Sequence, residues 1–247
     1  MRPRTSALLV VLACVAGLAG AAVRAAGQSA QAARDEVADE LAGARDFRPI
    51  TVTVDDEGRI VLGGEVQLLW TKQEAIRRAT EAASGREVVS ELTVTANDDD
   101  TVTLGGVERA IRNYEYLTVF DYVSGSIRNG VVTLTGQVTS VRDKSGDLAE
   151  RVSRVRGVQE LHNELEILPL FRADDEIRER LARAIFSRPN FERFAGMSNP
   201  PFRLIVRNGI VTLLGYVQGQ AEYLEMQQLA SQIPGILRVE NRLQTLK

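Results

Sequence analysis

The sequence predicts an α+β protein of tandem small modules, each a three-stranded mixed sheet with two helices packed on one face. The main observation is a repeat: two glycines six residues apart, then a helical pattern, then a third glycine. These glycines are Gly58, Gly64 and Gly85; Gly130, Gly136 and Gly157; and Gly209, Gly215 and Gly235. An alternating apolar run, typical of a strand, follows each third glycine. With a helical pattern in front, each copy has the order helix, strand, strand, helix, strand.

The most similar segments of the repeat predict a β-hairpin. They read RNGVVTLTGQV over 128–138 and RNGIVTLLGYV over 207–217. Asn-Gly favours a type I′ turn, because both central positions of that turn have a positive φ. The pair occurs at Asn129 and Gly130 and again at Asn208 and Gly209. The first copy has DDEG instead, a turn one residue longer.

Side-chain alternation predicts which face of the hairpin is buried. Val132, Leu134, Gly136 and Val138 share one face of the second strand. A core-facing glycine has no side chain to pack, so we expect a helix to pass closely over Gly136, and likewise over Gly215.

The last strand of the repeat carries an asparagine six residues after the third glycine. It is Asn163 in the second copy and Asn241 in the third, whereas the first copy has Glu91. The order of elements, the NGxVTLxGxV hairpin, the later glycine and this asparagine resemble the BON domain (bacterial OsmY and nodulation). The resemblance covers residues 30–96, 104–168 and 173–246, and the first copy is divergent.

This resemblance implies a module of the bacterial envelope that is not an enzyme and needs no cofactor. BON domains are proposed to bind phospholipids or to support envelope proteins. The resemblance also implies a periplasmic or outer-membrane-associated location.

The N-terminus predicts export. Residues 1–27 have a basic start, an uncharged apolar stretch and small residues, the layout of a signal peptide. Cleavage after Ala25 or after Gly27 would fit. Two alternatives stay open, an uncleaved N-terminal anchor and lipidation of Cys14. Removing residues 1–27 leaves 27 basic and 33 acidic residues, a net charge of −6, and no cysteine.

Few residues suggest catalysis or metal binding. The one histidine, His162, lies in an alternating strand pattern, so a Cys–His pair or a histidine metal site is not expected. The run NDDD at 97–100 lacks the ligand spacing of an EF-hand loop and is interpreted as a turn. It could join LTVTA before it and TVTLGG after it in an extra hairpin between the first two copies.

Two regions that differ between the copies are candidates for contact with a partner: the insertion 186–202 of the third copy, and the second-copy helix after the hairpin. The candidate residues are Arg188, Phe191, Arg193, Phe194 and Met197 in the insertion, and Arg142, Lys144, Arg151 and Arg154 in the helix. Aromatic and cationic side chains would suit an anionic lipid surface. Alternatively, the insertion folds back on its own sheet and the helix has an ordinary solvated face.

We therefore expect a periplasmic binding protein whose partner is an anionic phospholipid membrane surface. The alternative is a protein-interaction or chaperone-like module that accepts a partner strand on a sheet edge. A general nucleic-acid binder is not expected, because the chain is mildly acidic. The mature charge of −6 also means that any lipid contact must be local.

Overall fold

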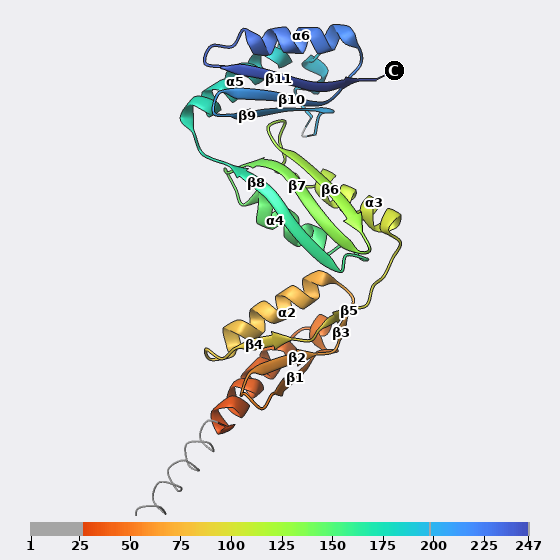
Figure 1. Ribbon diagram of the computed structural model, residues 1–247, viewed down its shortest axis with the longest axis vertical. Helices are drawn as coiled ribbons and strands as arrows, with labels where there is room; N and C mark the ends of the chain where they lie inside the picture. The colour runs from red at the N-terminus through yellow and green to blue at the C-terminus, as the bar shows by residue number, and fades with distance from the viewer. Residues whose placement is uncertain (1–26, 198, 247) are drawn as a thin grey trace, which may run out of the picture. The chain divides into compact units, whose positions relative to one another are not determined.

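The computed structural model describes residues 27–197 and 199–246 (Figure 1). The chain divides into two compact units, residues 1–96 and 97–247. Apart from Gly27, the predicted signal peptide lies outside the described residues, and so does Cys14. Within the described part of the chain, no helix combines the length and apolar character needed to cross a membrane.

The first unit is one module with a helix at residues 27–42. The elements that follow are η1 (Arg45–Phe47), β1 (Thr51–Val54), β2 (Ile60–Gly63), β3 (Glu65–Val66), α2 (Leu69–Ala82), β4 (Val88–Ser90) and β5 (Thr93–Val94). β1, β2 and β4 form one sheet, while β3 and β5 form a separate two-stranded sheet. The helix at 27–42 and α2 share a core with β1 and β2, in which Val37, Ile60 and Ala75 are fully buried.

The second unit contains two modules. The first consists of α3 (Asp100–Arg112), β6 (Tyr122–Arg128), β7 (Val131–Thr139), α4 (Lys144–Ser153) and β8 (Glu160–Leu168). The other consists of α5 (Arg172–Phe186), η2 (Glu192–Phe194), β9 (Phe202–Arg207), β10 (Ile210–Val217), α6 (Gln220–Ser231) and β11 (Arg238–Thr245).

Both modules of this unit confirm the predicted α+β architecture. In the sheets β6-β7-β8 and β9-β10-β11 the first two strands are antiparallel, and the third strand lies parallel to the central one. The helices α3 and α4 contact each other and their sheet, as do α5 and α6 (Figure 1).

Helix α3 corrects the extra hairpin expected between the first two copies. Residues 100–112 are helical, and β5 pairs with β3 instead. Thr103, Val107 and Ile111 recur every four residues and are buried, and this spacing gives α3 its apolar face. At the start of α3 the side chain of Asp99 accepts a hydrogen bond from the Thr101 N–H at 2.8 Å. Burial of one face and a capped start thus outweigh the weak helix propensity of the threonines and glycines.

The Asn-Gly turns have the predicted backbone and are fixed by an aspartate of the preceding helix. Asn129 and Gly130 have φ values of 51° and 76°, as a type I′ turn requires. Both of their N–H groups donate to the Asp100 carboxylate, at 2.7 and 2.9 Å. In the third module, Asp174 accepts from the Asn208 and Gly209 N–H groups at the same two distances. Among the described residues of the first module, Asp55 plays a local part instead and accepts from the Glu57 and Arg59 N–H groups of its own turn.

The expected close passage of a helix over Gly136 and Gly215 is wrong. The atoms nearest to a Cβ added at Gly136 belong to the backbone of β6, at Tyr122 and Val123. Gly136 has a φ of 130°, a conformation that side chains rarely adopt. Gly215 meets the backbone of Pro201 and Phe202 in the same way. These glycines therefore let two strands approach. The glycine beneath a helix is Gly125, whose added Cβ would lie 2.9 Å from Val107 of α3.

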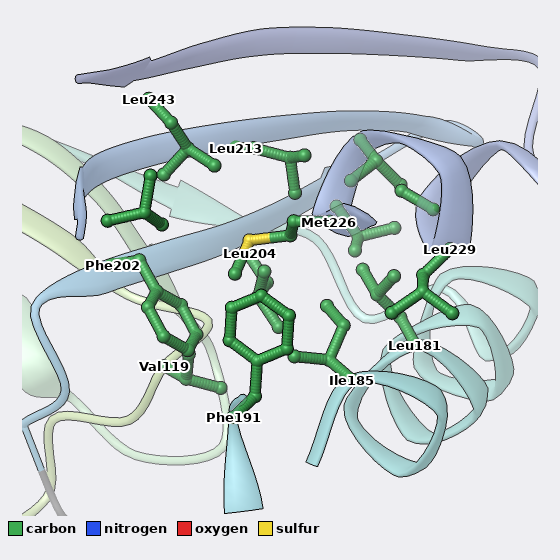
Figure 2. Packing of buried hydrophobic residues seen from close by; sticks show 14 of the residues in the cluster. Val119, Leu181, Ile185, Phe191, Phe202, Leu204, Leu213, Met226, Leu229 and Leu243 are labelled. Atoms are coloured by element: carbon green, nitrogen blue, oxygen red, sulfur yellow. The ribbon is translucent and has the colours of Figure 1, made fainter. Parts of the chain in front are cut away.

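The insertion of the third module folds back onto its own sheet, which is the interpretation that the rarity of exposed apolar patches favours. Phe191 is fully buried and meets Phe202 edge-on with ring centroids 6.0 Å apart. Phe194 meets the same ring edge-on at 5.3 Å. Figure 2 shows Phe191 and Phe202 within the core that the sheet forms with α5 and α6. Val119, from the preceding module, completes this core.

Candidate binding site at the junction of two modules

The loop before β6 joins the two modules of the second unit. Val119 is 9% exposed and packs into the core of the third module. Its carbonyl oxygen accepts a hydrogen bond of 2.7 Å from the Leu204 N–H of β9. The loop thus uses the edge of β9 that β10 leaves free, and it places residues of both modules side by side.

A buried ion pair holds this loop in place. Asp121 Oδ2 lies 2.6 Å from Lys144 Nζ, and the two side chains are 0% and 4% exposed. Asp121 Oδ1 accepts from the N–H and hydroxyl of Thr139, and Oδ2 accepts from the N–H and hydroxyl of Thr118. Burial alone would raise the pKa of Asp121, but the hydrogen bonds from Lys144, Thr139 and Thr118 together lower it below its usual range.

A cavity of about 650 Å³ opens beside this ion pair, and we call it the junction cavity. It is formed by the loop before β6, the end of β7 and the start of α4, the linker after β8 and the first turns of α5. Its apolar lining residues are Tyr116, Phe120, Val141, Leu168, Pro169 and Leu170. Val141 and Leu170 are 83% and 73% exposed, so the rim of the cavity presents apolar side chains to solvent.

Three polar side chains lining the junction cavity have hydrogen-bonding capacity left over. Arg178 is 6% exposed, and its Nε has no hydrogen-bond partner among the described residues. The buried Ser140 hydroxyl has none there either. Lys144 donates to Asp121 and to Thr139 Oγ1, which occupies two of its three N–H groups.

A second hollow of about 450 Å³ adjoins the cavity and shares Glu115, Tyr116 and Arg142 with it. We call it the arginine groove; its other lining residues are Tyr114, Asp147, Glu150, Arg151 and Arg154. The Arg142 guanidinium lies 3.9 Å from the centre of the Tyr116 ring, and that of Arg151 lies 5.1 Å from the Tyr114 ring. Both are cation–π contacts.

The aspartate of the groove orders these aromatic and cationic groups. The Tyr114 hydroxyl and Arg142 Nε both donate to Asp147 Oδ2, at 2.5 and 2.7 Å. Burial and the neighbouring carboxylate raise the pKa of Tyr114, whereas the two hydrogen bonds lower the pKa of Asp147.

The structure brings together three of the candidates from the second-copy helix region, Arg142, Arg151 and Arg154, in the arginine groove. Lys144, the fourth, is buried in its ion pair with Asp121 and cannot contact a partner at the surface.

The candidates of the insertion line neither the cavity nor the groove. Phe191 is a core residue and cannot reach a partner. Arg193 lies over the Phe194 ring at 4.3 Å and donates to Glu222 at 2.8 Å. Arg188 and Met197 are exposed. The insertion is therefore mainly part of the third module's own packing.

The repeated asparagines and glycines serve the scaffold. Asn163 Nδ2 donates to Ser145 at the start of α4, and Asn241 Nδ2 donates to the Tyr223 carbonyl of α6. Each asparagine thus ties the last strand to the second helix of its module. The remaining repeat glycines all have a positive φ; they are Gly58, Gly64, Gly85, Gly157 and Gly235.

Sequence reasoning missed the apolar rim and the buried cation of the junction cavity. Leu170 and Arg178 were not singled out, although the linker LPLF at 168–171 is unusually apolar for an exposed connection. The sequence pattern groups Val141 with Leu148, Val152 and Val155 on the buried stripe of the helix, and this is wrong for Val141, which precedes α4 and is 83% exposed. His162, as expected, is half exposed on β8, with Nε2 2.8 Å from Glu160. Among the described residues, no group of three or more histidine, cysteine or acidic side chains could hold a metal ion.

Two solved structures of secretion-system proteins are similar to the chain, at low sequence identity. The C-terminal domain of CdsD, a structural protein of the type III secretion system of Chlamydia trachomatis, is 18% identical over 86% of this chain and 96% of that chain, with a TM-score of 0.24. The periplasmic domain of PrgH from S. typhimurium is 11% identical over 80% of this chain and 94% of that one, with a TM-score of 0.20. Similarities this low carry no argument about function.

No curated protein matches the chain. The family model of the BON domain matches it three times, at residues 29–96, 99–169 and 173–247. These matches cover most of the sequence and coincide with the three modules described above. The chain therefore belongs to the BON domain family and carries three tandem copies of the domain.

Proposed function

We propose that this protein is a non-enzymatic component of the bacterial envelope that associates with anionic phospholipid surfaces. The observation that carries the proposal is the exposed apolar rim of the junction cavity beside the arginine groove. Val141 and Leu170 are far more exposed than is usual for side chains of their type. Clustered apolar exposure of this kind marks interaction surfaces. Apolar side chains can enter the acyl boundary while arginines next to them contact phosphates.

The arginines act locally in this proposal. Arg142 is paired with Asp147 and Arg154 with Glu150, so the groove carries little net positive charge. Insertion of the apolar rim would then supply most of the binding free energy, and the arginines would favour anionic headgroups over neutral ones.

The test is co-sedimentation of the processed chain, without residues 1–27, with phosphatidylglycerol and phosphatidylcholine vesicles at low salt. We expect stronger binding to phosphatidylglycerol. Substituting serine for both Val141 and Leu170 should weaken binding by about tenfold or more, since each change removes buried apolar area worth roughly 1–2 kcal/mol.

The matched control carries serine at Leu224 and Leu237, which are 55% and 81% exposed and lie outside the cavity and the groove. This variant should bind as the unsubstituted chain does. Equal loss in both variants, or no dependence on anionic lipid, would contradict the proposed surface.

A protein partner is the second candidate, and it is favoured by two glutamates at the cavity. Glu115 and Glu179 line it, are exposed and form no ion pair among the described residues. An apolar peptide with basic neighbours would complement such a rim. Capture of an envelope protein that is lost in the Val141 and Leu170 variant, with vesicle binding unchanged, would favour this candidate.

A further inference from the structure

We propose that the junction cavity binds a single acyl chain of a lipid, with the acyl carbonyl oxygen accepting hydrogen bonds from the buried donors of the cavity. This inference rests on the proposed function but goes further, because it assigns an internal site for one lipid molecule and not only a contact surface. Three properties of the cavity support it: its volume and walls, its excess of donors and its charge balance.

The volume and the walls suit a slender apolar ligand. About 650 Å³ lies within the range of about 300–1,000 Å³ found for small-molecule sites, which are mostly apolar with a few placed polar groups. Phe120 and Leu168 provide inner walls, and the exposed Val141 and Leu170 extend the apolar surface to the outside. A chain leaving a bilayer would therefore meet apolar contacts from the rim inward.

The two buried cations of the cavity, Arg178 and Lys144, can only donate hydrogen bonds, whereas the Ser140 hydroxyl can donate or accept. Arg178 uses Nη1 for Asp175 and Nη2 for the Val206 carbonyl, and its buried Nε is left over. The third N–H of Lys144 and the Ser140 hydroxyl are further donors. Both oxygens of Asp121 already accept from Thr118, Thr139 or Lys144. A ligand that satisfies this site must therefore bring an acceptor, because unpaired buried donors are costly.

The charges indicate that the acceptor is a neutral carbonyl. Asp121 compensates Lys144, and Asp175 lies 2.5 Å from Arg178, so each buried cation already has its anion. A charged headgroup would find no uncompensated cation inside. An ester carbonyl needs none, and a phosphate on the same molecule could lie outside, at the adjoining arginine groove. The structure thus separates the two parts of an acylated anionic lipid.

The test uses monomeric single-chain probes, each below its micelle concentration, in calorimetric titrations of the processed chain. Lauroyl-lysophosphatidylglycerol has an ester carbonyl and an anionic head, dodecanoate has a carboxylate, and dodecyl maltoside has neither acyl carbonyl nor charge. We expect one molecule of the lysolipid to bind, about tenfold more tightly than dodecyl maltoside, since a satisfied donor accounts for such a factor. Dodecanoate should bind more weakly than the lysolipid.

Ser140→Leu narrows the cavity and removes one donor, so it should weaken binding of the lysolipid by about tenfold or more. The matched control is Ser126→Leu, because Ser126 is an exposed β6 residue outside the cavity and the groove. A circular dichroism melt checks that both variants are folded. In the unsubstituted chain, nuclear Overhauser contacts from the acyl methylenes to the methyl groups of Leu168 report the site without any variant.

Three outcomes would overturn the inference: equal affinity for lysolipid and dodecyl maltoside, tighter binding of dodecanoate than of lysolipid, or contacts to residues outside the cavity. Vesicle binding that persists without lysolipid binding would refute the acyl site and leave the proposed surface intact. If the unsubstituted chain binds neither vesicles nor lysolipid, both the acyl site and the proposed surface are refuted. Contacts of a basic apolar peptide with the methyl groups of Leu168, with no such contacts from the lysolipid, would assign the cavity to a protein ligand.

Discussion

Gly136 shows how one missing side chain shapes the repeated hairpin. Its φ of 130° and the nearby β6 backbone leave no room for a Cβ. We predict that Gly136→Ala lowers the free energy of unfolding of the second unit by at least about 2 kcal/mol, from backbone strain and overpacking. Urea unfolding followed by the amide NMR signals of residues 97–247 measures the change.

Gly105→Ala is the matched control for this prediction. Gly105 lies within α3, and nothing lies within 4 Å of an added Cβ. Alanine there should raise stability by up to about 1 kcal/mol, because glycine is a poor helix former. If both variants lost stability equally, the conformation assigned to Gly136 would be incorrect.

At the scale of elements, a single aspartate connects a helix to a hairpin. Asp174 of α5 is 1% exposed and accepts from the N–H groups of Asn208 and Gly209. We predict that Asp174→Ala costs about 2–4 kcal/mol, because two charge-assisted hydrogen bonds are lost and the Gly209 N–H stays buried. Chemical denaturation of the full chain, monitored at the third module, measures this cost.

The control on the same helix is Glu176→Ala. Glu176 is half exposed and pairs with Arg172 and Arg180 at the surface, so its removal should change stability by no more than about 1 kcal/mol. A comparable loss in both variants would mean that removing a carboxylate from the first turns of α5, not losing the turn contact, explains the effect of Asp174→Ala.

Elements were predictable from the sequence to the extent that their signals are local. The Asn-Gly turns, the alternation of β7 and the order of elements follow from short patterns. Helix α3 was predictable only in its second half, where VERAIRNYE at 107–115 has a helical pattern. Its first half was not, because the threonines and glycines at 101–106 favour other structures. The contact of Asp100 with a turn about thirty residues later was not predictable either. An aspartate at a helix start has many possible partners, and only the fold selects one.

For the whole molecule, the pair Asp121 and Lys144 links two modules through the loop that it holds. We predict that Lys144→Met destabilises the second unit by about 3–5 kcal/mol at pH 7, because Asp121 is then buried without its cation. The exposed pair of Arg154 and Glu150 provides the control: Arg154→Met should cost at most about 1 kcal/mol. Urea unfolding at several pH values measures both.

The contribution of Asp121 to the free energy of unfolding should depend on pH with opposite sign in the unsubstituted chain and in Lys144→Met. In the unsubstituted chain the pKa of Asp121 is lower in the folded state than its unfolded value of about 3.9. Its stabilising contribution is therefore present above that value and is lost as the pH falls through the folded pKa. In Lys144→Met, burial dominates and the pKa rises, so acidification should reduce the deficit relative to the unsubstituted chain. A deficit that stays constant between pH 7 and pH 4 would contradict this account.

The junction cavity was not predictable from any one stretch of the sequence. Its walls come from segments between residues 115 and 179 that belong to two modules, and the sequence did not say whether neighbouring modules touch. The arginines of the groove could be found, since they cluster within one helix region. The aromatic residues beside these arginines could not be assigned to the groove, because the sequence positions of Tyr114 and Tyr116 are as compatible with core packing as with a surface site.

Val119 also has a temporal consequence. It lies in the core of the third module, yet it precedes Phe202 by about eighty residues in the chain. A chain that emerges amino terminus first presents this valine well before β9 exists. The third module completes its core only when this loop is in place, and Asp121 of the same loop is held by groups of the second module. We therefore predict that a delay in folding of the second module leaves the third with a gap the size of one valine.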